Sequence, residues 1–290
     1  MAEIEVQKTP DQEALEKIIE IRRASREQIK KIRRDLKQQK KEEKNKGKPA
    51  PLSRDEKQIR RQQIREAKRL EYVTRKKRYS TGEEIFNSIA SGIGAGLAIA
   101  ATVLLILRAI FESPVDMKAY YVTGVSVFGG TLILMYLIST LYHALAPIGA
   151  KKVFAILDHC SVYIFVAGTY TPFCLGAFNG TMGWVLFGII WTLAIIGVSL
   201  YAVYGSHMRI ASAITYFLMG WMILFVIKPV SAALPSLSLL FLVLGGVVYT
   251  AGIFFYSMKS MKWFHSIWHL FVIAGSVLHF FAVFFSIGRY

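Results

Sequence analysis

Apolar residues fill most of the last 210 positions of the chain in seven long stretches. They cover about residues 85–107, 119–145, 153–175, 180–204, 210–228, 236–257 and 263–287. Each stretch is about 20 residues or longer, which is the length of helix that crosses the hydrocarbon core of a bilayer. The connections are short, for example residues 205–209. The pattern predicts an all-α fold, a compact bundle of seven transmembrane helices over residues 81–290.

The first 80 residues follow a different pattern, rich in charge and poor in apolar mass. Apolar positions predict a weakly amphipathic helix over about 11–43, which the proline-containing segment 45–52 ends. Ser53 and Glu56 then have the spacing of a capping box, and they predict a second charged helix to about Arg78. We interpret residues 1–80 as a partly helical cytoplasmic tail.

Composition supports this division of the chain. The net charge is +16, and residues 1–80 hold 26 of the 35 Lys and Arg and 14 of the 19 Asp and Glu. Residues 81–290 hold the other 14 charged residues, about 7% against about 25% in a soluble domain. Cys160 and Cys174 lie about 21 Å apart along one predicted helix, too far to pair. An ordinary soluble domain and a disulfide scaffold are both excluded.

The distribution of basic residues predicts the orientation, because Lys and Arg favour the cytoplasmic side. The tail holds most of them, so we expect an inside N-terminus and an outside C-terminus. Residues 75–78 form a basic run just before the first span, where anionic lipid head groups attract such clusters. The tail is therefore either a solvated segment or one that binds an anionic membrane surface or a partner. Interleaved aromatic residues are missing, so no nucleic-acid binding is expected.

Four ionisable residues are predicted near the cytoplasmic ends of their helices. Asp158 lies in span three and His143 near the end of span two, while His265 and His269 share one face at the start of span seven. An ionisable group inside a bilayer is costly and usually functional. Ser139 lies one turn before His143. Their shared depth predicts a metal site.

Three histidines and an aspartate suit Zn²⁺. Three imidazoles with an open fourth position would form a catalytic site, whereas Asp158 as a fourth ligand would close it. Asp158 would either bind the metal directly or hold a zinc-bound water as general base. Ser139 would hydrogen-bond a ligand imidazole, the Asp158 carboxylate or its own helix. His279 lies about 21 Å from His265 along the helix, where it would line an interior cavity or satisfy a helix contact.

Five motifs resemble those of the hemolysin III family, which belongs with the progestin and adipoQ receptor proteins and is similar to the alkaline ceramidases. They are GEEIFNSI at 82–89, STLYH at 139–143, LDH at 157–159, AGTYTPF at 167–173 and HSIWH at 265–269. The resemblance covers about residues 80–290. It implies a multi-pass protein of a cell membrane, here a bacterial cytoplasmic membrane.

The resemblance also implies zinc on the cytoplasmic side, held by His143, His265 and His269. Asp158 would hold the zinc-bound water, and Ser139 would contact the ligand side chains without binding the metal itself. Bacterial members commonly have a histidine shortly after Asn87, where this chain has only apolar and small residues up to Gly92. Glu84 and Asn87 would contact the site or anchor the tail junction, and we favour the second role.

Three functions compete. The first is a zinc-dependent hydrolase of a lipid amide or ester, with an acyl chain in the aromatic-rich bundle; span five alone contributes Tyr216, Phe217, Trp221 and Phe225. The second is a zinc-containing receptor or sensor that signals through the basic tail. The third is a pore, ranked last because a pore needs polar groups along its whole path. Substrate and oligomeric state are not predicted.

Overall fold

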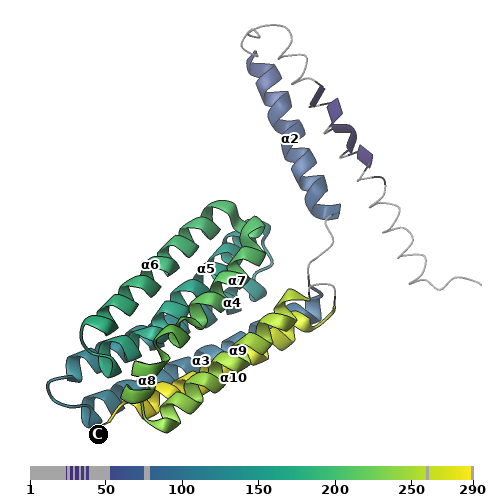
Figure 1. The fold of residues 1–290 in the computed structure, drawn as a ribbon. Coiled ribbons are helices and arrows are strands. Elements are labelled where there is room, and N and C mark those ends of the chain that lie inside the picture. Colours follow the sequence, from purple (N-terminus) through teal and green to yellow (C-terminus); the bar gives the residue numbers. More distant parts are fainter. Residues whose placement is uncertain are drawn as a thin grey trace, which may run out of the picture. The chain divides into compact units, whose positions relative to one another are not determined.

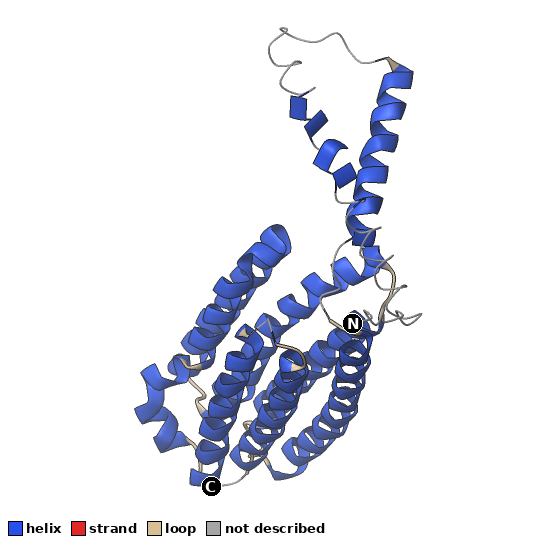
Figure 2. Ribbon diagram, turned by 90° about the vertical axis from the view of Figure 1, so that its right-hand side faces the viewer, coloured by secondary structure: helices blue, strands red, loops and turns tan. Residues whose placement is uncertain are grey.

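The structure is a computed structural model that describes residues 53–74, 79–258 and 261–288, with scattered positions between 24 and 38. The chain divides into two units, Met1–Arg78 and Tyr79–Tyr290. The described residues form helices and no strands (Figure 2). The predicted helix over 11–43 lies largely outside them, as does the predicted end of the second helix at Arg78.

In the first unit the described helix is α2, Arg54–Thr74. The Glu56 carboxylate accepts from the Ser53 backbone N–H at 2.8 Å, and the Ser53 hydroxyl accepts from the Glu56 N–H at 3.2 Å. The predicted capping box is confirmed, because these two bonds satisfy N–H groups that a helix start leaves unpaired. The side chains described in α2 are almost all exposed.

The second unit contains seven segments long and apolar enough to cross a membrane, and its long helices run side by side (Figure 1). Five of them are the helices α3 (Thr81–Glu112), α4 (Lys118–Ala144), α6 (Thr181–Tyr204), α9 (Ser236–Ser257) and α10 (Phe264–Ser286). A sixth joins α5 (Ile148–Pro172) to the π-helix η1 (Phe173–Ala177). The seven predicted spans are confirmed to within a few residues at most ends.

The remaining span is broken into α7 (Arg209–Gly220), the 3-10 helix η3 (Met222–Val226) and α8 (Ile227–Ala233). Pro229 lies in the first turn of α8 and lacks the N–H that would bond the Phe225 carbonyl, so a regular helix cannot continue unbroken from α7 into α8. The Tyr170 hydroxyl lies 2.8 Å from the Met219 carbonyl, to which it can donate, and it accepts from the Ile223 N–H at 3.1 Å. A side chain of α5 thus satisfies backbone groups that the break exposes.

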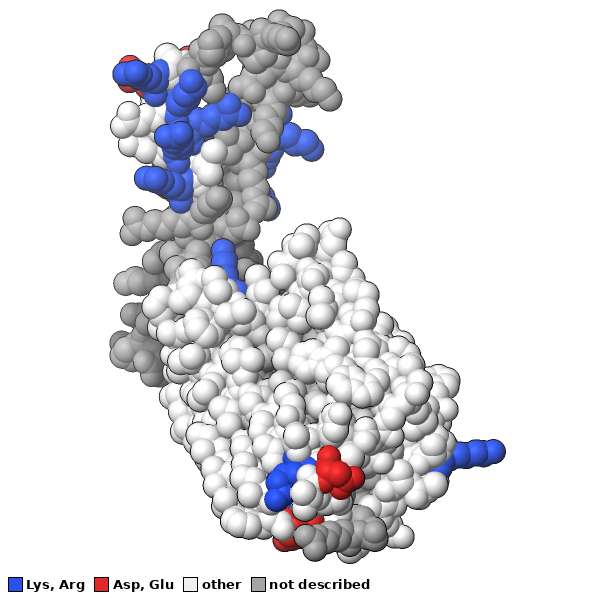
Figure 3. Space-filling model, turned by 90° about the vertical axis from the view of Figure 1, so that its left-hand side faces the viewer, with Lys and Arg blue, Asp and Glu red and all other residues white. Residues whose placement is uncertain are grey.

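The side chains of α3 are arranged inside out relative to a soluble protein. Ile85, Ile89 and Ile93 are each more than half exposed, while Asn87 and Ser91 are fully buried. Apolar residues outside and polar residues inside are the arrangement expected where the surroundings are lipid. Figure 3 shows the same property across one face, where charged side chains lie near the ends of an otherwise uncharged body. This chain is a multi-pass membrane protein.

The packing of the helices brings the first and last spans together and encloses a cavity. Neighbours in sequence pack on each other from α3 to α6, and α10 packs against both α9 and α3. Helices α4, α5, α7, α9 and α10 line a cavity of about 160 Å³. Residues far apart in sequence therefore meet where α3, α4 and α10 begin or end.

Candidate metal centre

Three histidine rings from two helices converge on one point. His143 lies in the last turn of α4, and His265 and His269 lie one turn apart at the start of α10. Their Nε2 atoms form a nearly equilateral triangle with sides of 3.2 Å (His143 to His269), 3.3 Å (His265 to His269) and 3.4 Å (His143 to His265). The predicted histidines are thus brought together, and the two rings of α10 owe their common face to the four-residue spacing.

The triangle has the dimensions of a metal-binding site. Nitrogen ligands about 2.0–2.1 Å from a tetrahedral metal ion lie about 3.3–3.4 Å from one another. The described residues contain one group of three or more metal-ligating side chains whose donor atoms all lie within 4.8 Å of one another, and these three histidines form it. Hydrogen bonds alone do not account for three nitrogens at this spacing, because each pair would need a donor and an acceptor. The donor set therefore fits a metal ion.

The outer nitrogen of His143 is held by a carboxylate on α3. Its Nδ1 lies 2.7 Å from Glu84 Oε2, and the other Glu84 oxygen accepts from Lys151 Nζ at 2.7 Å. A carboxylate can only accept, so Nδ1 carries the proton and Nε2 presents its lone pair to the centre of the triangle. Carboxylates that hold ligand imidazoles in this way fix the ring and raise its basicity. Glu84 contacts the site, contrary to the preferred prediction that it anchors the tail junction.

His269 is held from α3 as well, through a residue that sequence reasoning missed. Its Nδ1 lies 3.3 Å from Ser91 Oγ, and Ser91 donates to Ser139 Oγ at 3.2 Å. Ser139 thus reaches the triad through Ser91, which contacts both Ser139 and His269. Ser91 lies in the stretch after Asn87 where bacterial relatives commonly carry a histidine. That departure was the available signal that this face of α3 meets the site.

Glu83, next to Glu84, joins the start of α10 to the start of α3. Its carboxylate accepts from the Trp263 backbone N–H at 2.8 Å and completes a capping box with Ser80. Trp263 precedes α10 with a φ of 67°, a left-handed conformation unusual for a bulky residue. Tyr79 stacks on the His265 ring with centroids 4.6 Å apart. The two glutamates therefore fix both helices that carry the triad.

Asp158 lies on the wall of the cavity, which His265, His269 and Ser139 also line. Its carboxylate oxygens fall outside the cluster of the three nitrogens. The imidazole of His159 lies beside it, with Nδ1 3.7 Å from Oδ2. The structure thus does not place Asp158 among the three ligating side chains. It leaves the carboxylate on the surface that a molecule in the cavity would touch.

His159 also lines the cavity. Its Nε2 lies 3.0 Å from the Tyr256 hydroxyl, and its ring stacks on Tyr201 with centroids 4.9 Å apart. His159 is about 100° around the helix from Asp158, so the two side chains would be expected to face different surroundings. Here both side chains border the same space because the cavity lies between α5, α7 and α9 and is wider than one helix face.

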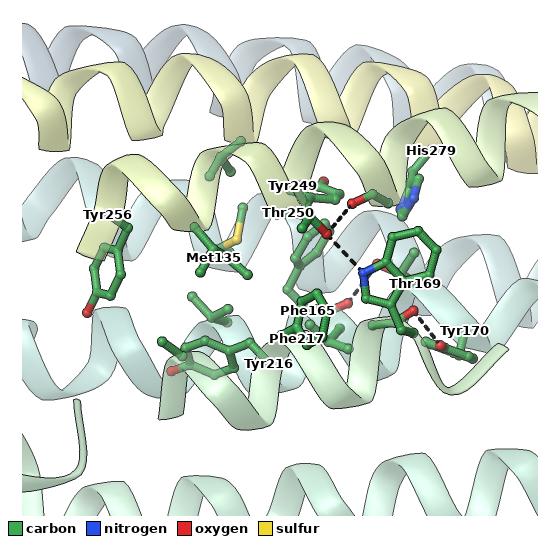
Figure 4. Close-up of a pocket in the computed structure, with 18 of the residues that line it drawn as sticks. Met135, Phe165, Thr169, Tyr170, Tyr216, Phe217, Tyr249, Thr250, Tyr256 and His279 are labelled. Atoms are coloured by element: carbon green, nitrogen blue, oxygen red, sulfur yellow. Dashed lines mark hydrogen bonds between the residues drawn. The ribbon is translucent and has the colours of Figure 1, made fainter. Parts of the chain in front are cut away.

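The cavity wall is mainly apolar and aromatic (Figure 4). Tyr216, Phe217 and Trp221 of the broken span line it, as span five was expected to do. Phe225 does not, since its side chain is 90% exposed on the outer surface. The break before Pro229 changes the helical register, which a periodic pattern cannot anticipate. The three-histidine site therefore opens into an apolar space lined by helices.

The fold and the site define a class: multi-pass membrane proteins with a three-histidine centre at one end of an internal cavity. The sequence profile described as "Haemolysin-III related" matches residues 79–280. The chain belongs to this haemolysin III-related family. Residues 1–78 lie outside the match.

Curated relatives agree with this assignment. The chain is 40% identical to "Hemolysin-3" of Bacillus cereus over 205 residues, 71% of this chain and 92% of that protein. It is 38% identical to "Hemolysin-3 homolog" of Bacillus subtilis (strain 168), over 71% of this chain and 95% of that protein. "Monocyte to macrophage differentiation factor" of Homo sapiens is 25% identical over 54% of this chain and 67% of its own length. No solved structure matches significantly.

Proposed function

We propose that this protein is a zinc-dependent intramembrane hydrolase of a lipid amide or ester. The observation that carries the proposal is the convergence of three Nε2 atoms at one end of an apolar cavity. A purely structural metal site would need neither a cavity beside it nor a fourth position left free of protein ligands. The carboxylate of Asp158 on the same wall adds a group able to take up a proton.

Zinc is the metal that this ligand set suits best. Three neutral imidazoles with tetrahedral spacing and an open fourth position are characteristic of catalytic zinc sites. Imidazole also suits copper, iron and nickel, so the identity has to be measured. When bound, zinc would supply Lewis-acid polarisation of a carbonyl and would acidify a water molecule.

The chain's own residues would divide the remaining tasks. Glu84 and Ser91 hold His143 and His269 in the tautomer whose Nε2 lone pair faces the centre. Asp158 takes a proton from the attacking water and gives it to the leaving amine or alcohol, so that the carboxylate is regenerated. The apolar wall holds the acyl chain and keeps bulk water from it. Each role requires the substrate carbonyl to lie between the triad and Asp158.

Turnover of a labelled ceramide by the purified full-length protein, in detergent or nanodiscs, tests the proposal. We expect the Asp158→Ala variant to lose about 10²–10⁴-fold in turnover, the range for a general acid or base. Asp116→Ala removes an exposed aspartate between α3 and α4 and serves as the matched control, with unchanged turnover. Equal turnover by wild type and Asp158→Ala would contradict the mechanism.

We further propose that the tail lies on anionic lipid. Helix α2 contains seven Lys and Arg against four Asp and Glu, and its described side chains are mostly exposed. Each basic residue near an anionic surface is stabilised by about 1 kcal/mol. Trypsin should therefore cut α2 more slowly in nanodiscs that contain phosphatidylglycerol than in pure phosphatidylcholine, and high salt should remove the difference. Equal cutting rates in both membranes would argue for a solvated tail.

A further inference from the structure

The cavity has a second polar region, far from the triad. Figure 4 shows Tyr256 at one end of the cavity and His279, Thr169, Tyr170 and Thr250 towards the other. The Tyr256 ring marks the triad end, because its centroid lies 6.2 Å from that of His265. We call the opposite region, around His279 and Thr250, the far end.

The hydroxyls of the far end already have partners. Thr250 Oγ1 accepts from the Trp221 Nε1–H at 2.9 Å and donates to the Gly246 carbonyl at 2.8 Å. Tyr170 bonds the backbone of the broken span, as described above. The Tyr249 hydroxyl lies 2.9 Å from Ser276 Oγ. These groups need no ligand to satisfy their hydrogen-bonding capacity.

His279 is the exception at this end. Its side chain lines the cavity and is 9% exposed, yet neither ring nitrogen has a hydrogen-bond partner within the described part of the chain. The Leu242 carbonyl faces the ring without reaching hydrogen-bond geometry. A neutral imidazole has one donor and one acceptor, and both are unmet at His279. The Leu242 carbonyl, which only accepts, offers nothing to the unprotonated ring nitrogen.

The position of this ring is built into the packing of α9 on α10. Gly245 lies where its backbone meets the edge of the His279 ring, and a Cβ at that position would overlap the ring. Tyr249, one turn further along α9, holds the ring edge-on with centroids 5.1 Å apart. A buried polar group left without a partner costs free energy, so a fixed one in a cavity indicates a ligand or an ordered water.

We propose that His279 binds a hydroxyl group carried far along the acyl chain of the lipid in the cavity. This inference rests on the proposed function, which places the lipid carbonyl at the triad. A hydroxyl can donate to the unprotonated ring nitrogen or accept from the protonated one, whereas a ketone can only accept. The substrate class is thus a lipid with a hydroxylated long chain, and His279 is a specificity-determining residue.

The spacing of the two ends fixes the position of the hydroxyl. The level midway between His265 and His269 lies twelve residues before His279 on α10, a rise of about 18 Å. An extended chain advances about 1.25 Å per carbon, given single bonds of about 1.5 Å at nearly tetrahedral angles. The hydroxyl should therefore lie about 14 carbons from the carbonyl, close to the end of a sixteen-carbon chain.

Competition for a fluorescent fatty acid tests this inference. Full-length protein in detergent is loaded with cis-parinaric acid, which is then displaced by hexadecanoic, ω-hydroxyhexadecanoic or α-hydroxyhexadecanoic acid. The preference for the ω-hydroxy acid over hexadecanoic acid should fall about fivefold in His279→Leu, the factor of one net hydrogen bond. The α-hydroxy acid carries its hydroxyl beside the carboxylate, so its affinity relative to hexadecanoic acid should not change. His279→Asn, whose amide oxygen accepts, should restore part of the preference.

The outcomes separate this inference from the hydrolase proposal. If the preference is the same in wild type, His279→Leu and His279→Asn, His279 binds only water and the inference is overturned. Failure of all three acids to displace the probe would overturn it as well. Turnover of a ceramide with an unsubstituted N-acyl chain, and metal content, are measured without an ω-hydroxylated acyl chain. Either binding result therefore leaves the hydrolase test independent. Unchanged binding of hexadecanoic acid shows that the leucine variant is folded.

Discussion

The start of α10 and its third quarter carry histidines in opposite circumstances. At the start of the helix, His265 and His269 meet His143. The Nδ1 atoms of His143 and His269 each contact a side chain of α3. Fourteen residues after His265, the buried His279 has no hydrogen-bond partner among the residues that the structure describes, and it faces an apolar cavity. Burial alone therefore does not identify a metal ligand. Convergence of several nitrogens and a fixed tautomer do, and these depend on helices far away in the sequence.

The largest expected effect is loss of the metal. Replacing both α10 ligands, as His265→Ala/His269→Ala, should reduce bound metal from about one ion per chain to less than a tenth, because a single imidazole cannot hold the ion. Elemental analysis of protein purified without chelator or immobilised metal measures this. His279→Leu should keep the full metal content. The contrast between the two ends disappears if that variant also loses metal, or if folded wild type contains none.

Removing the carboxylate behind His143 should weaken the metal without abolishing it. Glu84→Gln replaces a charged acceptor by a neutral one, and loss of such a partner costs about 10- to 100-fold in metal affinity. Competition with a zinc-binding dye gives the affinity. Glu112→Gln makes the same change at the other end of α3 and should have no effect. An unchanged affinity in Glu84→Gln would mean that Glu84 only pairs with Lys151.

At the far end, substitution should affect stability and spare the metal. Tyr170→Phe removes the hydroxyl that bonds the broken span and leaves buried backbone groups unpaired, at a cost of about 1–3 kcal/mol in the free energy of unfolding. Thermal unfolding with metal analysis of the same sample measures both quantities. Phe217→Tyr, on α7, serves as a control because it adds a hydroxyl and removes no hydrogen bond. Loss of metal in Tyr170→Phe would show that the two ends are coupled.

The smallest effect is expected behind His269. Ser91→Ala removes a contact of 3.3 Å, long for a hydrogen bond to a hydroxyl, so we expect a loss of metal affinity of about tenfold at most. Ser88→Ala on the same helix removes a bond to the Thr140 carbonyl and should leave the affinity unchanged. Equal losses in the two variants would assign the effect to packing of α3 on α4.

Most of the fold and the grouping of the three histidines could be predicted from the sequence. Span length and the four-residue spacing of His265 and His269 are local properties, so both can be read from the sequence of a single helix. The support from Glu84 and Ser91 is not local, because it depends on α3 packing between α4 and α10. The same holds for Tyr170, which bonds a span about 50 residues away. The orientation in the membrane, the role of Asp158 and the metal remain predictions.

The joining of the first and last spans also sets an order of events during synthesis. His143 leaves the ribosome 122 residues before His265. At about 5–20 residues per second, this is an interval of about 6–24 s. During this time Glu84 can already engage His143 and Lys151, but two of the three nitrogens do not yet exist in the membrane. The proposed metal capture would therefore be an event of the completed chain, because a protein arrested before α10 would contain only one of the three histidines.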